Sequence, residues 1–235
     1  LKEYNAKATF FVVGDVAREY PEVVSLIASA NHEIACHSDR HITLDKLTPD
    51  SFEKDLESNL EALSRIGVKN ISGFRAPVLS ITNRTRWAYK ILAKVGFKYS
   101  SSVLPTFSPF HGWGNFGIGP KEIDGIIEIP ITTTPFFFPI IGGVYFRVLP
   151  KFALMTAYTW ACRQGVPIAG YLHPYDLDTK AKHIRFPGVG NDFFSWLMYV
   201  NRSTVEYKLR SLLANPVSAI TCSDWVNKLR IAAPV

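Results

Sequence analysis

Short apolar runs rich in β-forming residues alternate along the chain with segments of helical periodicity, and this alternation is the strongest constraint on the fold. The run Ala8 to Val13 is closed by Gly14, as expected of a strand buried on both faces. Pro21 then opens a helical pattern that Asn31 ends. Repeated units of strand, helix and strand predict a mainly parallel sheet and therefore an α/β fold.

The same alternation continues to the end of the chain, and its clearest helix follows Thr48. That threonine is suited to cap the helix, Pro49 to open its first turn and Gly67 to end it. Further strands are expected at residues 32–36, 71–75, 97–99, 126–131, 167–172 and 217–221, and further helices at 82–95, 151–163 and 203–214. About seven strands without a glycine-rich phosphate loop favour a closed barrel over a doubly wound sheet.

Length and charge exclude several other classes of protein. The chain has 235 residues, a length at which α/β barrels fold as one unit, so residues 1–235 are expected to form a single domain. The formal net charge of +6 is spread along the chain rather than massed in one block, which argues against a nucleic-acid partner. The most apolar region, residues 126–150, contains charged residues and prolines, so no transmembrane helix is expected.

The cysteines and the first residues bear on the compartment. Cys36, Cys162 and Cys222 lack the spacing of a disulfide framework or a thiolate zinc site, so each is expected to be a small core residue. The chain starts at Leu1 and no apolar signal segment follows it. The cytoplasm and the cell envelope therefore both stay open as compartments, as does the oligomeric state.

Three polar residues stand at the carboxyl ends of expected strands, which is where parallel α/β barrels place their active sites. His37 follows the strand at 32–36, Arg75 closes the strand at 71–75, and His173 follows the strand at 167–172. All three are expected to point into one mouth of the barrel. Two of the six histidines of the chain and one arginine are thereby predicted to converge on a common site.

Each of these residues has a functional and a structural interpretation. The spacing of His37 and His41 puts two imidazoles on one side of a helical turn, within reach of one divalent cation. In the structural interpretation, His37 caps a strand and His41 lies on the surface. Arg75 closes a buried strand, where it is expected to contact a catalytic carboxylate or to form a structural ion pair. His173, followed by the strand-ending Pro174, is a candidate general acid or a buried core histidine.

Other segments give weaker indications. Residues 105–120 are expected to form a long loop, a feature that is usually functional in compact domains. The run Phe136 to Ile141 is interpreted as core, with a sugar groove or a membrane-facing patch as alternatives. His32, His111 and His183 have no partner evident from spacing, so they are expected to be structural or exposed.

A set of short motifs stands in a fixed order along nearly the whole chain. They are Ala8-Thr-Phe-Phe-Val, Asn31-His-Glu-Ile-Ala-Cys-His-Ser-Asp-Arg-His41, Gly73-Phe-Arg-Ala-Pro77, Gly96-Phe-Lys-Tyr-Ser-Ser-Ser102, Glu128-Ile-Pro130, Gly142-Gly-Val-Tyr-Phe-Arg147 and Tyr171-Leu-His-Pro-Tyr-Asp176. In this combination the chain resembles the polysaccharide deacetylases of carbohydrate esterase family 4, also called the NodB-homology family. Within that family it is most similar to the branch associated with PEP-CTERM exopolysaccharide systems.

The resemblance implies a distorted (β/α) barrel that removes N-acetyl groups from the amino sugars of a polysaccharide. It implies a divalent metal, of the zinc type, that His37 and His41 bind as ligands. It further implies that Arg75 orients the catalytic base and that His173 is the general acid. Three more positions are implied to bind the substrate: Pro77, Tyr145 and Arg147.

The chain also departs from the family pattern. A first motif with paired aspartates, which supplies the catalytic base and a third metal ligand, should precede Ala8, yet residues 1–7 contain no aspartate. We therefore expect a barrel without its first strand, part of a longer reading frame and, by itself, poorly soluble and inactive. Ser100 stands where similar sequences have aspartate, and Asp39 is not expected to replace the missing ligand. A catalytically inactive carbohydrate-binding relative and a hydrolase of small-molecule amides are the alternative functions.

Overall fold

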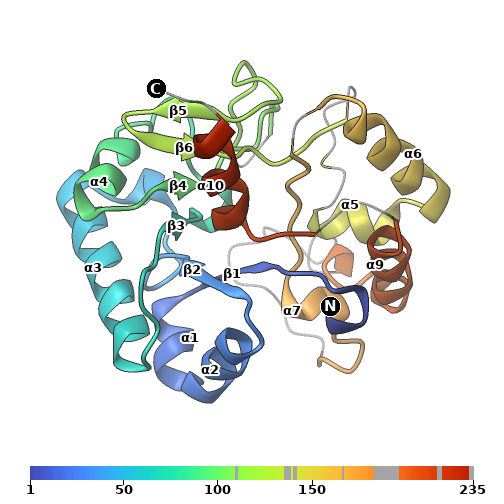
Figure 1. Ribbon diagram of the computed structural model, residues 1–235, viewed down its shortest axis with the longest axis horizontal. Helices are drawn as coiled ribbons and strands as arrows, with labels where there is room; N and C mark the ends of the chain where they lie inside the picture. The colour runs from blue at the N-terminus through green and yellow to red at the C-terminus, as the bar shows by residue number, and fades with distance from the viewer. Residues whose placement is uncertain are drawn as a thin grey trace. The chain divides into compact units, whose positions relative to one another are not determined.

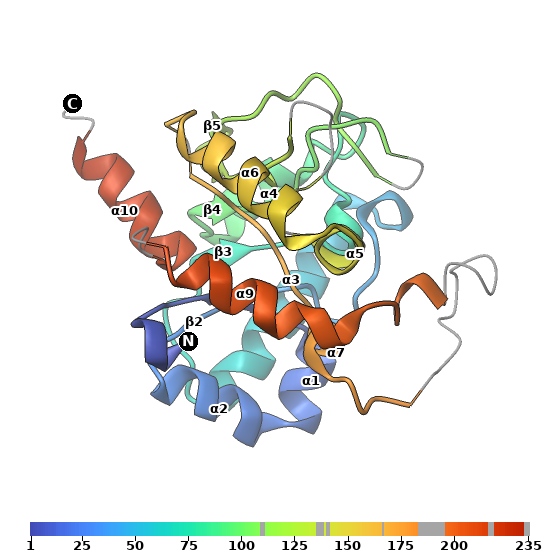
Figure 2. The ribbon, with the colours of Figure 1, turned by 90° about the vertical axis from the view of Figure 1, so that its right-hand side faces the viewer.

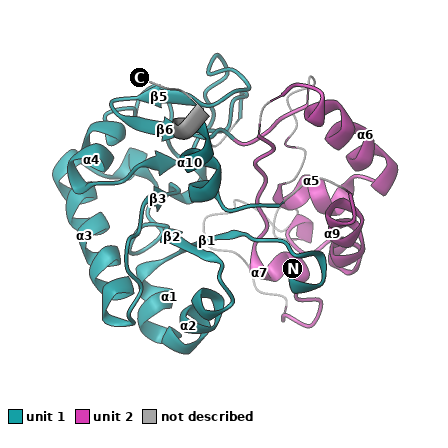
Figure 3. Ribbon diagram, viewed as in Figure 1, with its two compact units in different colours: residues 1–130, 218–235 teal, residues 131–217 magenta. Residues whose placement is uncertain are grey.

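The computed structural model describes residues 1–108, 111–134, 139, 142–165, 167–182, 196–215 and 219–232. The chain divides into two compact units, which Figure 3 colours separately. Unit 1 consists of residues 1–130 and 218–235, and unit 2 of residues 131–217. The expectation that the chain is one domain stays a prediction.

Unit 1 is built around a six-stranded sheet in the order β1-β2-β3-β4-β6-β5 (Figure 1). Its strands are β1 (Thr9–Val12), β2 (Glu33–Cys36), β3 (Gly73–Phe74), β4 (Tyr99–Ser100), β5 (Lys121–Ile123) and β6 (Ile126–Glu128). Strands β1, β2, β3, β4 and β6 run parallel, and β5 is antiparallel to β6. The predicted α/β class is therefore confirmed. In the part of the chain that the structure describes, the sheet is open, with β1 and β5 at its edges.

Helices connect the parallel strands of unit 1, as the alternation in the sequence predicts. They are α1 (Gly14–Glu19), α2 (Pro21–Ser29), α3 (Pro49–Arg65) and α4 (Ala88–Val95). Helix α10 (Cys222–Ala232) comes after the last strand, and 3-10 turns lie at Lys2–Tyr4, Leu44–Lys46 and Pro77–Leu79. Helix α3 has the predicted cap, because the Thr48 side chain accepts from the N–H of Ser51 and the Ser51 hydroxyl accepts from that of Thr48. Gly96 ends α4 with a φ of 104°, which glycine adopts readily.

Some boundaries differ from the sequence expectation for local reasons. Helix α4 begins at Ala88 rather than near residue 82. The Thr85 hydroxyl donates to the carbonyl of Ser80 at 2.8 Å and accepts from the N–H of Thr82 at 2.9 Å, which holds these residues in turns. The pattern also misses α1, β5 and α10. Of the strand expected at 217–221, residues 219–221 are described, and they are not in a strand.

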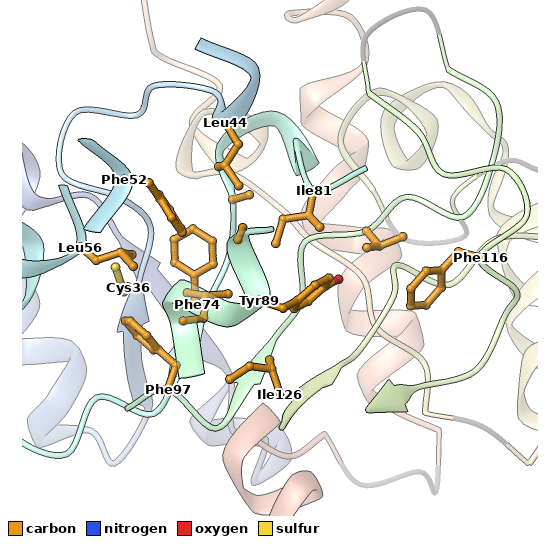
Figure 4. Packing of buried hydrophobic residues seen from close by; sticks show 14 residues of the cluster. Cys36, Leu44, Phe52, Leu56, Phe74, Ile81, Tyr89, Phe97, Phe116 and Ile126 are labelled. Carbon is orange, nitrogen blue, oxygen red and sulfur yellow. The ribbon is translucent and has the colours of Figure 1, made fainter. Parts of the chain in front are cut away.

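The main core of unit 1 involves helices α3 and α4 and strand β3. Phe52 of α3 packs edge-on against Phe74 of β3 and against Trp87, with ring centroids 5.5 and 5.7 Å apart. Figure 4 shows Phe52 and Phe74 side by side in this cluster. Such aromatic pairs add about 0.5–1.5 kcal/mol beyond their burial. This packing anchors β3 and hence the backbone of Arg75, which directly follows it.

Unit 2 contains helices α5 (Gly143–Val148), α6 (Lys151–Cys162), α7 (Pro174–Leu177) and α9 (Val205–Leu213), with a 3-10 turn at Arg202–Thr204. Figure 2 shows α5, α6 and α9 next to one another. Buried side chains from these three helices form one apolar cluster: Phe146, Leu154, Tyr158, Ala161, Val205 and Leu212. The helices expected at 151–163 and 203–214 are confirmed. The strand expected at 167–172 is reduced to an isolated bridge between Tyr171 and Gly142.

The cysteine expectation is only partly confirmed. All three cysteines are free, and Cys36 is buried, but Cys222 is half-buried and Cys162, the last residue of α6, is exposed. The expectation that Cys162 is a core residue is therefore wrong. Among the described helices, none has the length and apolar character needed to cross a membrane. The run at 136–141, apart from Pro139, and His183 lie outside the described residues.

Candidate active site

The two histidines of the predicted metal site lie together in unit 1. His37 directly follows β2, and the ring centroids of His37 and His41 are 4.9 Å apart with the rings at 81°. The sequence argument placed them on a helical turn, and that detail is wrong because residues 37–43 form no helix. Ser38 and His41 instead adopt left-handed φ values of 63° and 56°, which fold the loop back on itself. Such backbone strain is characteristic of functional sites.

Buried hydrogen bonds hold this histidine loop, residues 37–43, against the sheet and helix α3. The side-chain amide of Asn59 donates to the carbonyls of Val12 at 2.9 Å and Ser38 at 2.6 Å. The hydroxyl of Ser38 in turn accepts from the N–H of His41 at 2.9 Å. Asn59 is fully buried, so it ties the loop to the end of β1 without competition from water.

Replacing Asn59 with leucine is expected to lower the free energy of unfolding by about 2 kcal/mol, because it removes two buried hydrogen bonds, one to the carbonyl of Val12 and one to that of Ser38. Urea denaturation measures this change. Asn227→Leu, the same substitution at an exposed position of α10, is the matched control and should leave stability nearly unchanged. Equal stability of the two variants would show that Asn59 does not hold the loop.

Asp39, between the two histidines in sequence, has other partners. Its carboxylate is 2.7 Å from the guanidinium of Arg18, and its N–H donates to the carboxylate of Asp55 at 3.0 Å. A Cβ atom at Gly14 would collide with Asp39 Oδ1, so glycine is required there for this close approach. Asp39 is thus bound to Arg18 and Asp55 within the loop, and the expectation that it is no metal ligand stays a prediction.

His37 has the bonding of a metal-ligating histidine. Its Nδ1 lies 2.8 Å from the carbonyl oxygen of Arg75, and because a carbonyl can only accept, Nδ1 carries the proton. The lone pair is then on Nε2, and metal-binding histidines commonly donate their other nitrogen in this way. Burial lowers the pKa of His41, which favours the neutral imidazole that a metal requires.

The histidine pair fits part of a divalent-metal site. Imidazole nitrogens are suitable ligands for zinc, and the rings of His37 and His41 are neighbours with centroids 4.9 Å apart. Within the described residues, no group of three or more histidine, cysteine, aspartate or glutamate side chains could hold a metal ion. Metal binding by His37 and His41 therefore stays a prediction, and no third protein ligand is found among the described residues.

Arg75 is held rigidly beside the histidine pair. Its Nε donates to the carbonyl of Ser101 and its Nη2 to the Ser101 hydroxyl, both at 2.7 Å. The guanidinium also lies over the ring of Phe11, 4.2 Å from the centroid. The plane of the guanidinium is thereby fixed. Its predicted action on a catalytic base stays a prediction, as does substrate binding by the buried Pro77, two residues further on.

Glu128, to which the sequence analysis assigned no role, is a buried glutamate that holds the segment after β4 in place. Glu128, fully buried on β6, accepts from the N–H groups of Ser102 at 2.6 Å and Val103 at 2.9 Å, and from the hydroxyl of Tyr89 at 3.1 Å. Burial raises its pKa, and these hydrogen bonds counteract that rise. Glu128 thus fixes the segment after β4 that holds Arg75 through Ser101. The signals in the sequence were an acid within an apolar run and the position of that acid in the motif Glu128-Ile-Pro130.

His173 lies in unit 2, directly before helix α7. Its ring stacks on Tyr175, with centroids 4.7 Å apart, and meets Tyr171 edge-on at 5.5 Å. Its Nδ1 is 3.3 Å from the carboxylate of Asp176, which forms an ion pair with Arg147 of α5. Sequence reasoning missed Asp176 as a site residue.

The predicted site residues are divided between the two units. His37, His41, Arg75 and Pro77 belong to unit 1, whereas His173, Tyr145 and Arg147 belong to unit 2. Tyr145 is half-buried on α5, two residues before Arg147, which has no exposed side-chain surface. Substrate binding by either of these two residues stays a prediction.

Comparison with known proteins relates both halves of the chain to families. Residues 1–100 match the family model described as "Polysaccharide deacetylase", and residues 101–226 match the model described as "Domain of unknown function (DUF3473)". The peptidoglycan-N-acetylglucosamine deacetylase of Bacillus cereus is 34% identical over 89 residues, which are 37% of this chain and 32% of that protein. The chain thus matches about a third of the length of this curated relative.

Two solved structures share the fold over almost the whole chain. A protein from Mycobacterium smegmatis classed with the polysaccharide deacetylases has a TM-score of 0.68 at 22% identity, covering 99% of this chain and 74% of its own. The Puue allantoinase has a TM-score of 0.61 at 18% identity, covering 100% and 70%. At these identities the likeness is one of fold, and it confirms the predicted deacetylase-type architecture.

Proposed function

Because the chain belongs to the DUF3473 family and carries a polysaccharide deacetylase domain over residues 1–100, we propose that it is a metal-dependent polysaccharide N-deacetylase. The reaction is hydrolysis of the N-acetyl groups on amino sugars of an exopolysaccharide or cell-wall glycan. The observation that carries the proposal is the pairing of His37 with His41, with Nδ1 of His37 bound to the carbonyl of Arg75.

The residues of the chain would divide the work as follows. His37 and His41 would hold the cation through imidazole nitrogens, and a bound zinc-type ion would polarise the acetyl carbonyl. Arg75, fixed by Ser101 and Phe11, would orient the carboxylate that takes a proton from water. His173 would protonate the departing amine nitrogen, since an amine anion is too poor a leaving group. Tyr145 would contact the sugar.

Acetate release from N-acetylglucosamine oligomers tests this function directly. The protein should be assayed at its natural length, with any residues that its gene encodes before Leu1, after loading with zinc and after treatment with a chelator. We expect zinc-dependent release of acetate. Retention of the oligomers without acetate release would instead support a catalytically inactive carbohydrate-binding protein, an alternative favoured by the two-histidine ligand set of the described residues. Cleavage of cyclic amides but not of oligomers would support a small-molecule amidohydrolase.

A further inference from the structure

The loop that follows β4 presents an aromatic side chain to solvent. In its described part, the loop at residues 105–120 contains no helix or strand, as expected from its sequence. Phe107 lies in this loop and is 89% exposed, the largest fraction among the large apolar residues of the described chain. Single exposed apolar residues are common on protein surfaces, but Phe107 differs from most of them because its ring is held in place.

The ring of Phe107 rests on the backbone of Gly114. A Cβ atom at Gly114 would lie 2.8 Å from Cζ of the ring and 2.9 Å from Cε2, so only glycine permits this close approach. The residues directly before Phe107 and Gly114 are joined through a common acceptor, because the N–H groups of Thr106 and Trp113 both donate to the carbonyl of Leu104, at 2.8 and 2.9 Å. The exposed ring therefore has a defined position.

The base of the loop is anchored in the main core of unit 1. Trp113 packs edge-on against Phe116, with ring centroids 5.1 Å apart. Phe116 is buried, and Figure 4 shows it in the cluster that also contains Phe74 of β3. The loop is thus part of the packed structure of unit 1, and Phe107 extends from a rigid base.

Hydrogen bonds also connect the loops that follow β2, β3 and β4. The N–H of Leu44, directly after the histidine loop, donates to the hydroxyl of Ser80 at 3.1 Å. Ser80, in the segment after β3, forms an isolated antiparallel bridge with Val103, two residues after the Ser101 that holds Arg75. These strand-end loops therefore form one connected surface at the carboxyl end of the sheet.

This surface places the loop of Phe107 within reach of a chain bound at the histidine pair. Strand β3 alone separates β2 from β4. Neighbouring strands lie about 4.8 Å apart, so the ends of β2 and β4 are about 10 Å apart. The intervening loops carry two further exposed apolar residues, Ile42 and Val78. A glycan with one N-acetyl group at His37 and His41 would extend across this edge.

The loop suits an uncharged ligand that has C–H groups on one side and hydroxyl groups on the other. Residues 104–120 contain no lysine, arginine, aspartate or glutamate, so they offer no charge to an anionic glycan or to a phospholipid headgroup. The face of an aromatic ring carries negative partial charge, which attracts the C–H groups of a pyranose. One face of a neutral N-acetylated sugar can therefore stack on the ring while its hydroxyls stay in water.

We propose that Phe107 is a stacking platform for a pyranose ring next to the sugar whose acetyl group lies at the histidine pair, so that the loop after β4 forms a second sugar subsite. The inference rests on the proposed function and narrows it to an uncharged N-acetylated glycan. Phe107 makes or breaks no bond, so its removal should weaken binding of the glycan and leave the chemical step unchanged.

Binding of the N-acetylglucosamine tetramer, followed by NMR titration of the natural-length protein in a chelator, tests the subsite without turnover. Phe107→Ala is expected to raise Kd about fivefold to tenfold, and Phe107→Tyr, which keeps the ring, to stay within about twofold of the parent. Phe152→Ala removes another exposed phenylalanine, on α6 of unit 2, and should leave Kd unchanged. Equal affinity of Phe107→Ala and the parent would overturn the proposal, as would failure of the parent to bind the tetramer.

A second variant displaces the ring without altering it. In Gly114→Ala the new Cβ would push the ring of Phe107 aside, so affinity for the tetramer should fall as it does in Phe107→Ala. Unchanged affinity would contradict the held ring position on which the proposal depends. Sedimentation with phosphatidylcholine vesicles tests the other use of an exposed ring, and vesicle binding that Phe107→Ala abolishes would overturn the assignment to a sugar.

Kinetics separate this inference from the proposed function. In acetate release from the tetramer, Phe107→Ala should raise KM by the same factor as Kd, with kcat within about twofold of the parent. A lowered kcat with unchanged KM would overturn the binding role of Phe107. Absence of acetate release from the parent protein would count against the proposed function, whereas the binding titration would still decide the sugar subsite.

Discussion

Replacing His37 with alanine is expected to weaken zinc binding by more than about a hundredfold and to abolish acetate release. Loss of an outer partner of a metal ligand costs about 10–100-fold in affinity, and loss of the ligand itself should exceed that range. The effect should be large because His37 and His41 are the two imidazoles that the structure brings together, with ring centroids 4.9 Å apart. Calorimetric zinc titration of the protein at its natural length measures the change.

The matched control for this loss is His111→Ala. His111 lies in the same unit, where its Nε2 is 3.1 Å from the carboxylate of Asp45, so the substitution removes a histidine without touching the pair. Zinc affinity should then stay within about twofold of that of the parent protein. Unchanged zinc affinity in His37→Ala would show that the pair is not a metal site.

Replacing Glu128 with alanine is expected to reduce the free energy of unfolding by about 3–5 kcal/mol. The substitution leaves three buried donors without an acceptor: the N–H groups of Ser102 and Val103 and the hydroxyl of Tyr89. Each unsatisfied buried group costs about 1–3 kcal/mol. Urea denaturation followed by circular dichroism measures the loss.

Two further variants locate this effect at the carboxylate. Glu122→Ala on the exposed strand β5 should change stability by less than about 0.5 kcal/mol. Glu128→Gln keeps one acceptor oxygen, so it should be intermediate between the parent protein and Glu128→Ala. If Glu128→Ala were as stable as Glu122→Ala, the hydrogen bonds of Glu128 would not be what orders the segment after β4.

Local signals in the sequence were sufficient for many of the elements. Thr48 and Ser51 form the cap of α3 with their own side chains, and Gly96 ends α4 through its own backbone conformation. These devices act within one helical turn, so a short window of sequence contains all the atoms involved. The same holds for the alternation that predicted the parallel sheet, because side-chain periodicity is a property of each strand or helix taken alone.

Elements whose formation depends on distant partners escaped the sequence analysis. Helix α10 begins where the N–H of Cys222 donates to Thr9 and that of Ser223 to Glu33, about two hundred positions earlier in the chain. The strand expected at 167–172 shows only one bridge, between Tyr171 and Gly142. A window of ten or twenty residues contains no information about such partners, which is why propensity is a weak guide at these positions.

The candidate active site likewise depends partly on the local sequence and partly on contacts between distant segments. The sequence by itself determined the residue types: two histidines four positions apart, and Arg75 and His173 expected at the ends of strands. Only the tertiary structure decided how they work, since the protonated nitrogen of His37 depends on a carbonyl 38 positions away and His41 reaches it through a strained loop rather than a helix.

The supporting acids belong to the tertiary structure alone. Glu128 and Asp176 stand in motifs of the sequence, but no role could be assigned to them there; each becomes important because folding removes water and leaves specific donors around the carboxylate. The energy of a charged group depends on every dipole and charge within a few ångströms, and those neighbours come from different strands and helices. The sequence therefore determined which chemistry the chain carries, and the burial and partners that tune it were decided only when distant segments packed together.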